Sequence, residues 1–147
     1  MTKQICLDNC SPKHEGGQSL VELAITLTVI LILLAGIVDL GRAFFAYMAL
    51  RDSAQEAALF GSIDPTDTIG MSNRALAVLA NRVDTSNVTI TPVVSGSSCG
   101  NGSNSITVTV LYSNFAITMP FLGTLVGTQS FDISTNITDT ILSPPCP

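Results

Sequence analysis

The chain has 147 residues, with six Lys or Arg residues against eleven Asp or Glu residues and a formal net charge of −5. After residue 17 it contains four arginines and nine acidic residues, with no lysine and no histidine. This balance argues against a nucleic-acid partner, because such binding relies on clustered Lys and Arg that neutralise phosphates. The lack of a histidine base argues against nucleophilic catalysis, so we expect no enzyme activity, no cofactor and no metal site.

A membrane-spanning helix is the first element that the sequence predicts. An apolar run extends from Leu20 to Val38, and about twenty such residues can cross a hydrocarbon core of roughly 30 Å. The residues before it include two lysines and two adjacent glycines, and we interpret residues 1–17 as a leader peptide. Because the small residues precede the apolar run, an ordinary secretory signal peptide is not predicted. The chain is therefore expected to be anchored in a lipid bilayer.

Glu22 is an acidic residue inside this apolar run. A charged side chain at a bilayer centre costs about 2.5 to 3.5 kcal/mol on insertion scales, which makes Glu22 a functional candidate. A peptidase cut between Gly17 and Gln18 would place Glu22 about one helical turn from the new α-amine. A neighbouring helix could supply the same amine, which predicts a role of Glu22 in assembly. The alternative is a carboxylate that only reaches towards the headgroups.

Three segments of the chain resemble a known family. They are Gly17-Gln18-Ser19-Leu20-Val21-Glu22-Leu23-Ala24, Gly36-Ile37-Val38-Asp39-Leu40-Gly41-Arg42 and Ala54-Gln55-Glu56-Ala57-Ala58. The family is that of the TadE-like pseudopilins, minor pilins of tight-adherence (Flp, type IVb) pilus systems. The resemblance implies cleavage by a prepilin peptidase after Gly17, a role of Glu22 in processing or assembly, and an extracytoplasmic C-terminal part. Thr28 stands where the family often has proline, and Leu59 stands where it has arginine.

One helix is predicted to run from about Gln18 to Leu59, because no proline follows the apolar run over this stretch. Asp39 and Arg42 are three residues apart and share a face near the membrane boundary. This pair is expected either to register one subunit on the next or to form an interfacial ion pair, with Arg42 reaching the headgroups. The outer half also has an apolar face that permits close approach of a sheet or of other helices. That face comprises Ala43, Ala46, Leu50, Ala54, Ala57 and Ala58.

Gly61 and the turn Asp64-Pro65-Thr66-Asp67 are predicted to end this helix, with helix capping favoured over calcium binding for the two aspartates. A second helix is expected over Ser72 to Val83. Its predicted apolar face is Leu76, Leu79 and Val83.

Three strands are expected over 88–94, 106–112 and 131–141, and Pro92 places the first at a sheet edge. The loop Ser95 to Ser105 joins the first two strands. The apolar connector Phe115 to Val126 is expected either to cover the core or to dock on a partner.

The cysteines divide between the leader and the rest of the chain. Cys6 and Cys10 lie in the predicted leader, whereas Cys99 and Cys146 belong to the exported portion. A disulfide between the latter two would stabilise the fold by about 4 kcal/mol on the chain-entropy model. We expect this disulfide, and the alternative is two free thiols.

These elements predict an α+β fold of the type IV pilin kind. A long N-terminal transmembrane helix continues into a small extracytoplasmic domain with a short second helix and a three-stranded antiparallel sheet. The expected division is a leader (1–17), a transmembrane and assembly helix (18–61) and an extracytoplasmic domain (62–147).

The resemblance implies a minor pilin of a pilus for surface attachment. The implied partners are other pilin subunits, prepilin peptidase, the inner-membrane platform of the pilus and the lipid bilayer. The expected location is the cytoplasmic (inner) membrane, with the N-terminus in the cytoplasm, or an extracellular pilus. The alternative function is a signal-anchored extracytoplasmic binding domain that does not polymerise.

Overall fold

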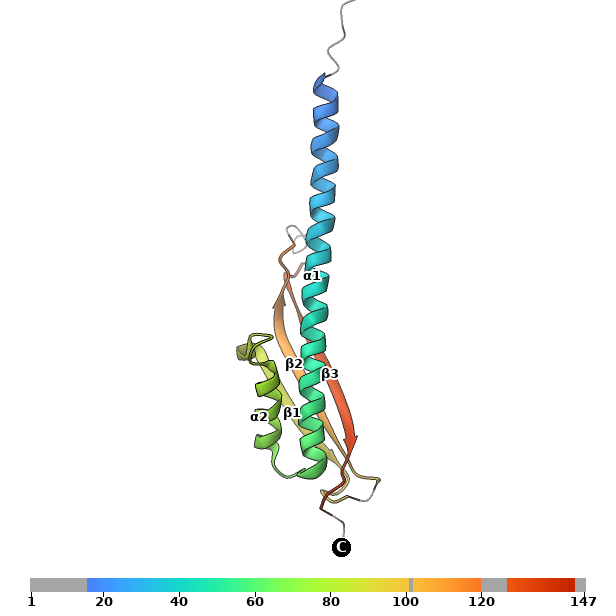
Figure 1. Cartoon of the computed structure of the whole chain (residues 1–147), viewed down its shortest axis with the longest axis vertical. Coiled ribbons are helices and arrows are strands. Elements are labelled where there is room, and N and C mark those ends of the chain that lie inside the picture. The colour runs from blue at the N-terminus through green and yellow to red at the C-terminus, as the bar shows by residue number, and fades with distance from the viewer. Residues whose placement is uncertain (1–15, 101, 120–126, 145–147) are drawn as a thin grey trace, which may run out of the picture.

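The computed structural model describes residues 16–100, 102–119 and 127–144. A long helix, α1 (Gly16–Ile63), runs through the molecule, and an antiparallel sheet lies along its C-terminal half (Figure 1). The other elements are α2 (Thr68–Leu79), the 3-10 helix η1 (Thr85–Asn87), β1 (Val88–Ser95), β2 (Ser105–Ala116) and β3 (Ser130–Thr140). This layout confirms the predicted α+β fold. Residues 1–15 of the predicted leader lie outside the described residues.

The N-terminal half of α1 is an exposed apolar helix, and most of its large aliphatic side chains are more than half exposed. The Thr26 and Thr28 hydroxyls donate to the carbonyls of Glu22 and Ala24, at 2.9 and 2.8 Å. Neither hydroxyl would therefore face lipid without a hydrogen bond. By length and composition α1 can cross a membrane, as predicted. Its 48 residues span on the order of 70 Å, so the helix continues well beyond a bilayer core.

The C-terminal half of α1 packs on the sheet through small side chains. Its buried apolar residues are Ala46, Ala49, Leu50, Ala54, Ala57 and Ala58. They form one core cluster with Ile106, Val108 and Val110 of β2, and Ala43 is half-buried beside it. Because an alanine side chain is a single methyl group, the helix backbone can approach the sheet closely. The predicted apolar face is confirmed, and its partner is the chain's own sheet.

Gly61 does not end α1, contrary to the sequence-based prediction, because the helix continues to Ile63. A Cβ atom at Gly61 would lie 2.6 Å from Met71 Sδ and 3.1 Å from Ile106 Cγ1. The glycine therefore allows α2 and β2 to pack closely against α1. Pro65 accounts for the end of the helix, because proline disfavours the helical conformation of the preceding residue.

The second helix is shifted by one turn from its predicted position. α2 covers Thr68–Leu79 instead of residues 72–83, because Asp67 caps its N-terminus and accepts a hydrogen bond from Gly70 N at 2.8 Å. The capping role expected for this turn is thus confirmed for Asp67. The buried face of α2 is Met71, Ala75 and Leu79, so only Leu79 of the predicted face is buried within the helix, and Val83 packs against the core from beyond its end. Leu76 and Val83 are only half-buried.

The sheet has the strand order β1-β2-β3, and both neighbouring pairs are antiparallel. The three predicted strands are confirmed, with β2 longer than expected. Ile106, Val108 and Val110 alternate with half-buried residues along β2 and point into the core. Pro92 of β1 pairs with Val108 of β2, and β1 is an edge strand as predicted.

A bulge interrupts β2 between Tyr112 and Phe115. Asn114 has a φ of 59° there, and its backbone N–H donates to Asp132 Oδ1 at 2.9 Å. Asparagine tolerates this left-handed conformation better than most residues. Beyond the bulge Phe115 is buried, so the start of the apolar connector covers the core. The connector residues 120–126 lie outside the described residues.

Candidate functional site

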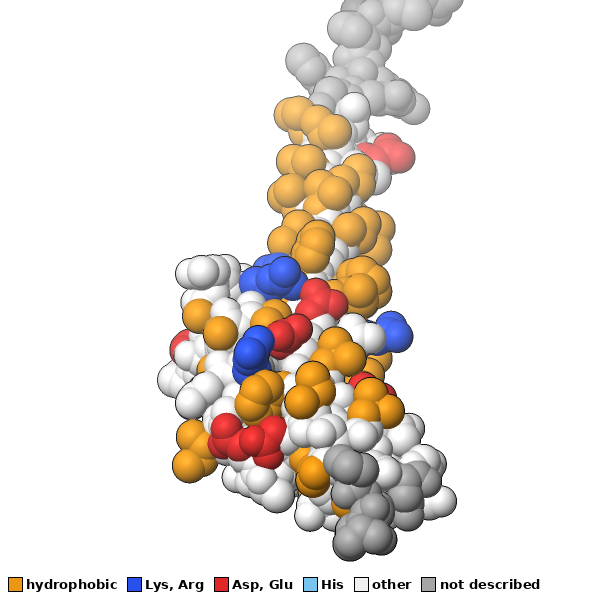
Figure 2. Space-filling model, turned by 60° about the horizontal axis from the view of Figure 1, so that its bottom comes forward, with side chains coloured by type: hydrophobic (Ala, Val, Ile, Leu, Met, Phe, Trp, Pro, Cys, Tyr) orange, Lys and Arg blue, Asp and Glu red, His pale blue; other side chains and the backbone are white. Residues whose placement is uncertain are grey.

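Glu22 lies on the exposed N-terminal half of α1. Its backbone carbonyl accepts the Thr26 hydroxyl, but its carboxylate makes no hydrogen bond or ion pair within the described parts of the chain. Figure 2 shows an acidic side chain on the otherwise apolar helix. The structure thus presents an ionisable group that has no partner in residues 16–100, 102–119 and 127–144, on the part of α1 that can cross a membrane.

The predicted cleavage bond joins Gly17 and Gln18, in the first turn of α1. A Cβ atom at Gly17 would meet no atom of the described residues within 4 Å, so their packing does not require glycine there. The first N–H groups of a helix lack intrahelical partners, which makes this turn the easiest to open. Gly17 itself is exposed in the structure.

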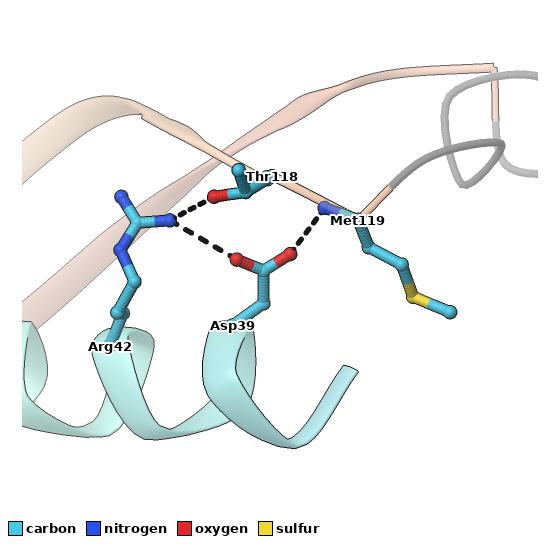
Figure 3. A network of polar contacts seen from close by, with 4 residues as sticks. All are labelled: Asp39, Arg42, Thr118 and Met119. Carbon is cyan, nitrogen blue, oxygen red and sulfur yellow. Dashed lines mark hydrogen bonds and ion pairs between the residues drawn. The ribbon is translucent and has the colours of Figure 1, made fainter. Parts of the chain in front are cut away.

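Asp39 and Arg42 form an ion pair, with Arg42 Nη1 3.1 Å from Asp39 Oδ1. Both residues also contact the segment that follows β2 (Figure 3). Asp39 Oδ2 accepts the backbone N–H of Met119 at 2.5 Å, and Arg42 Nη1 donates to Thr118 Oγ1. Asp39 is only 8% exposed as a result. We call these four residues, Asp39, Arg42, Thr118 and Met119, the clasp.

The clasp is supported by apolar contacts. The Arg42 guanidinium lies over the Phe115 ring, 5.4 Å from its centroid, and Phe115 stacks at a tilt on Phe131 of β3, with centroids 5.3 Å apart. Met119 reaches Gly36, where a Cβ atom would lie 3.7 Å from its Sδ atom. These contacts hold the end of the sheet against the helix where the apolar run ends.

The sequence predicted the Asp39–Arg42 pair but not its partners in the clasp. Thr118 and Met119 are 76 and 80 residues away along the chain, and no local pattern links them to the helix. The pair was expected to contact another subunit or the headgroups. In the structure it joins two segments of one chain, and part of Arg42 remains accessible, with 48% of its side chain exposed.

Two further ion pairs link the outer half of α1 to α2 and the segment after it. Arg74 Nη1 lies 3.3 Å from Glu56 Oε1, and Arg82 Nη1 lies 2.8 Å from Asp52 Oδ2. All four side chains are about half exposed, so each pair contributes little to stability. Asp52 and Glu56 of α1 thus each meet an arginine that follows α1 in the chain.

Two aspartates beside these helices have a lowered pKa. The Thr66 hydroxyl donates to Asp64 Oδ1 at 2.8 Å and lowers the pKa of Asp64. The backbone N–H of Ser86 donates to Asp84 Oδ1 at 3.0 Å and lowers the pKa of Asp84. Hydrogen bonds to a carboxylate favour its charged form, so both groups are ionised at neutral pH.

The loop that contains Cys99 is held by Asn104. Asn104 Nδ2 donates to the Cys99 carbonyl at 2.7 Å, and Asn104 Oδ1 accepts Ser97 N at 3.0 Å. Gly100 N donates to Pro144 O at 2.7 Å, which brings the chain next to Cys99 alongside the C-terminal segment. Cys146 lies outside the described residues, so the disulfide stays a prediction.

The described residues contain no group of three or more His, Cys, Asp or Glu residues that could hold a metal ion. The features that stand out are therefore the helix, its carboxylate and the clasp. Residues 17–59 match the family model described as TadE-like protein. This stretch of the chain is similar to TadE-like proteins. The match covers Gly17, Glu22, Asp39 and Arg42, whereas α2 and the sheet lie beyond it.

The TadE-like match indicates a pilus-associated structural protein that works with other pilus components. Curated proteins gave no significant match to this chain, and solved structures gave none either. The likeness to the family thus rests on α1, which by length and composition can span a membrane.

Proposed function

We propose that this protein is a TadE-like minor pilin that is cleaved after Gly17 by a prepilin peptidase. After cleavage α1 stays in the cytoplasmic membrane, with its N-terminus towards the cytoplasm and residues 62–147 outside. The subunit then enters or initiates a tight-adherence pilus that attaches cells to surfaces. Its partners are other pilin subunits, the inner-membrane platform and the peptidase.

The observation that carries this proposal is the carboxylate of Glu22, which has no partner in the described residues and lies on an exposed apolar helix. An isolated charge in hydrocarbon is unfavourable, whereas a carboxylate and an ammonium brought together reduce each other's penalty. Cleavage before Gln18 creates such an ammonium one helical turn away. Staggering two α1 helices by about a turn would place the amine of one against the carboxylate of the other.

The clasp supports the same proposal. It fixes the sheet to α1 at Asp39 and Arg42, so the globular part keeps a defined position along the helix. The exposed half of α1 is left free to contact lipid or other helices. A subunit built this way presents the same helix to its neighbours whether it lies in the membrane or in a filament.

Glu22→Ala tests the proposal in a host with the complete pilus system. The variant should reach the membrane at normal or higher levels, because it loses a charge that opposes insertion. It should give few filaments and little co-purification with other pilins. Glu22→Asp keeps the charge but shortens the side chain by one methylene group, so partial loss is expected.

Thr28→Ala is the matched control, because it also removes a polar group from the apolar half of α1. The Thr28 hydroxyl already bonds Ala24 O, so this variant should assemble normally. Normal filaments that contain Glu22→Ala at the usual ratio would refute the assembly role of Glu22. A chain that is never cleaved or incorporated would instead be an anchored binding domain that does not polymerise.

A further inference from the structure

A hollow of about 320 Å³ lies where the globular part meets the helix. Its lining includes Arg42, Phe45 and Ala46 of α1, Arg82 and Asp84 from the segment between α2 and η1, and Tyr112 of β2. Figure 2 shows basic and acidic side chains gathered at this junction, below the apolar helix. Of the four clasp residues, only Arg42 lines the hollow.

A second space, a groove of about 600 Å³, lies along α1 on the N-terminal side of the hollow, and Arg42 is common to the two linings. Leu34, Ala35 and Val38 form its apolar part, and the clasp residues Asp39, Arg42 and Thr118 line the rest. Positions 34, 38 and 42 are four residues apart and so follow one face of the helix. Arg42 lines both spaces, so a charged hollow and an apolar groove meet at one guanidinium.

The position of the hollow along α1 can be compared with the headgroup layer of a bilayer. Leu40, 72% exposed, is the last large aliphatic residue before Arg42. At 1.5 Å per residue, Arg42 lies about 3 Å beyond Leu40 and Ala46 about 9 Å beyond it. The polar layer on each side of a bilayer is about 5 to 7 Å thick. With Leu40 at the edge of the hydrocarbon, the hollow begins at headgroup level at Arg42 and extends just beyond that layer at Ala46, while Leu34 and Val38 of the groove lie at the level of the acyl chains.

The charged side chains that line the hollow suit a ligand that carries both a negative and a positive charge. Within the described residues, Arg42 and Arg82 donate through Nη1 to Asp39, Thr118 and Asp52, and a guanidinium has five N–H donors. Asp84 accepts both hydrogen bonds from Ser86 through Oδ1. Two guanidinium groups can hold a phosphate, and the Asp84 carboxylate can accept from an ammonium.

We propose that the hollow binds a zwitterionic phospholipid with a primary amine, its phosphate on Arg42 and Arg82 and its ammonium on Asp84. One acyl chain lies in the groove along Leu34 and Val38. The lipid is taken from the leaflet that faces the globular part. The proposal rests on the membrane placement of α1 proposed above, but it requires neither cleavage nor polymerisation.

The test is native mass spectrometry of the full chain in mild detergent. The probes are phosphatidylethanolamine, phosphatidylcholine and phosphatidylglycerol with identical acyl chains. Phosphatidylethanolamine should bind most tightly, because only it offers both a phosphate and a hydrogen-bonding ammonium. Arg82→Gln should weaken its binding about tenfold, the usual size of a lost hydrogen bond between charged groups.

Arg74→Gln is the matched control. Arg74 pairs with a carboxylate of α1 and is about half exposed, as Arg82 is, but it does not line the hollow. It should leave lipid binding unchanged. Asp84→Asn should lower phosphatidylethanolamine binding to the level of phosphatidylcholine, and asparagine caps η1 as well as aspartate does.

Equal effects of Arg82→Gln and Arg74→Gln would overturn the proposed site. The proposed site would also be overturned if phosphatidylglycerol bound most tightly and did so in Asp84→Asn as well. The hollow would then select a simple anion. Flotation of the chain with phosphatidylethanolamine and phosphatidylcholine vesicles checks insertion separately. A chain that floats without lipid preference refutes only this inference, whereas a chain that does not float also refutes the proposed anchoring.

Discussion

Gly61→Ala is expected to destabilise the protein although alanine is the better helix former. In an exposed helix interior this substitution stabilises by about 1 kcal/mol. At Gly61 the new Cβ would lie 2.6 Å from Met71 Sδ and 3.1 Å from Ile106 Cγ1, both fully buried side chains. Overpacking of this kind costs about 1 to 3 kcal/mol. The net effect is a loss of about 0 to 2 kcal/mol.

Gly41→Ala is the control for helix propensity. Gly41 lies on the same helix, and a Cβ atom there would meet nothing within 4 Å. This variant should gain about 1 kcal/mol, so the two variants should differ by about 1 to 3 kcal/mol. For a domain of this size, 1 kcal/mol shifts the thermal midpoint by about 4 to 8 °C. Gly61→Ala should therefore melt at least about 4 °C below Gly41→Ala.

The assay is thermal unfolding of the full-length variants in the same detergent micelles, followed by calorimetry and circular dichroism. Met71→Ala completes a double-mutant cycle with Gly61→Ala, because it removes the sulfur atom that the new Cβ would meet. The two changes should be coupled by at least about 1 kcal/mol, within the range for residues in contact. Stabilisation by Gly61→Ala equal to that of Gly41→Ala, or strict additivity with Met71→Ala, would refute the close packing described here.

Three further predictions concern processing, the cysteines and pH. The mature protein should lack residues 1–17 by intact mass, and Gly17→Val should retain them; an uncleaved wild-type chain in a host with active peptidase would contradict this. Non-reducing peptide mapping should recover Cys99 linked to Cys146, and Cys99→Ser should lower the thermal midpoint; complete alkylation of both thiols in unreduced protein would exclude the bond. Because folding lowers the pKa of Asp64 and Asp84 below the ordinary 3.8, their stabilising contribution is complete above that pH and disappears as the pH falls through their folded values. Replacing both aspartates with Asn should reduce the loss of unfolding free energy at acid pH, measured by unfolding at a series of pH values. An unchanged loss would show that other groups cause it.

Local sequence patterns determined the elements of this protein. The apolar run predicts a long anchor helix whatever the rest of the chain does, because hydrocarbon tolerates backbone only when its hydrogen bonds are internal. The alternation of Ile106, Val108 and Val110 predicts a strand with one buried face, and Pro92 cannot donate to a neighbouring strand. Asp67 was predicted to cap a helix for an equally local reason. Each of these follows from residues within a few positions of one another.

The tertiary structure decided how these elements meet. Gly61 looked like the end of a helix, and only the approach of Met71 and Ile106 shows why a glycine lies inside one. The buried face of α2 depended on its starting residue, which the turn geometry set. The clasp joins Asp39 to Met119 across 80 residues, and the hollow beside it draws its charges from separate segments. Contacts of this range depend on which faces pack together, and periodicity along the chain shows which face is apolar but not which other face it meets.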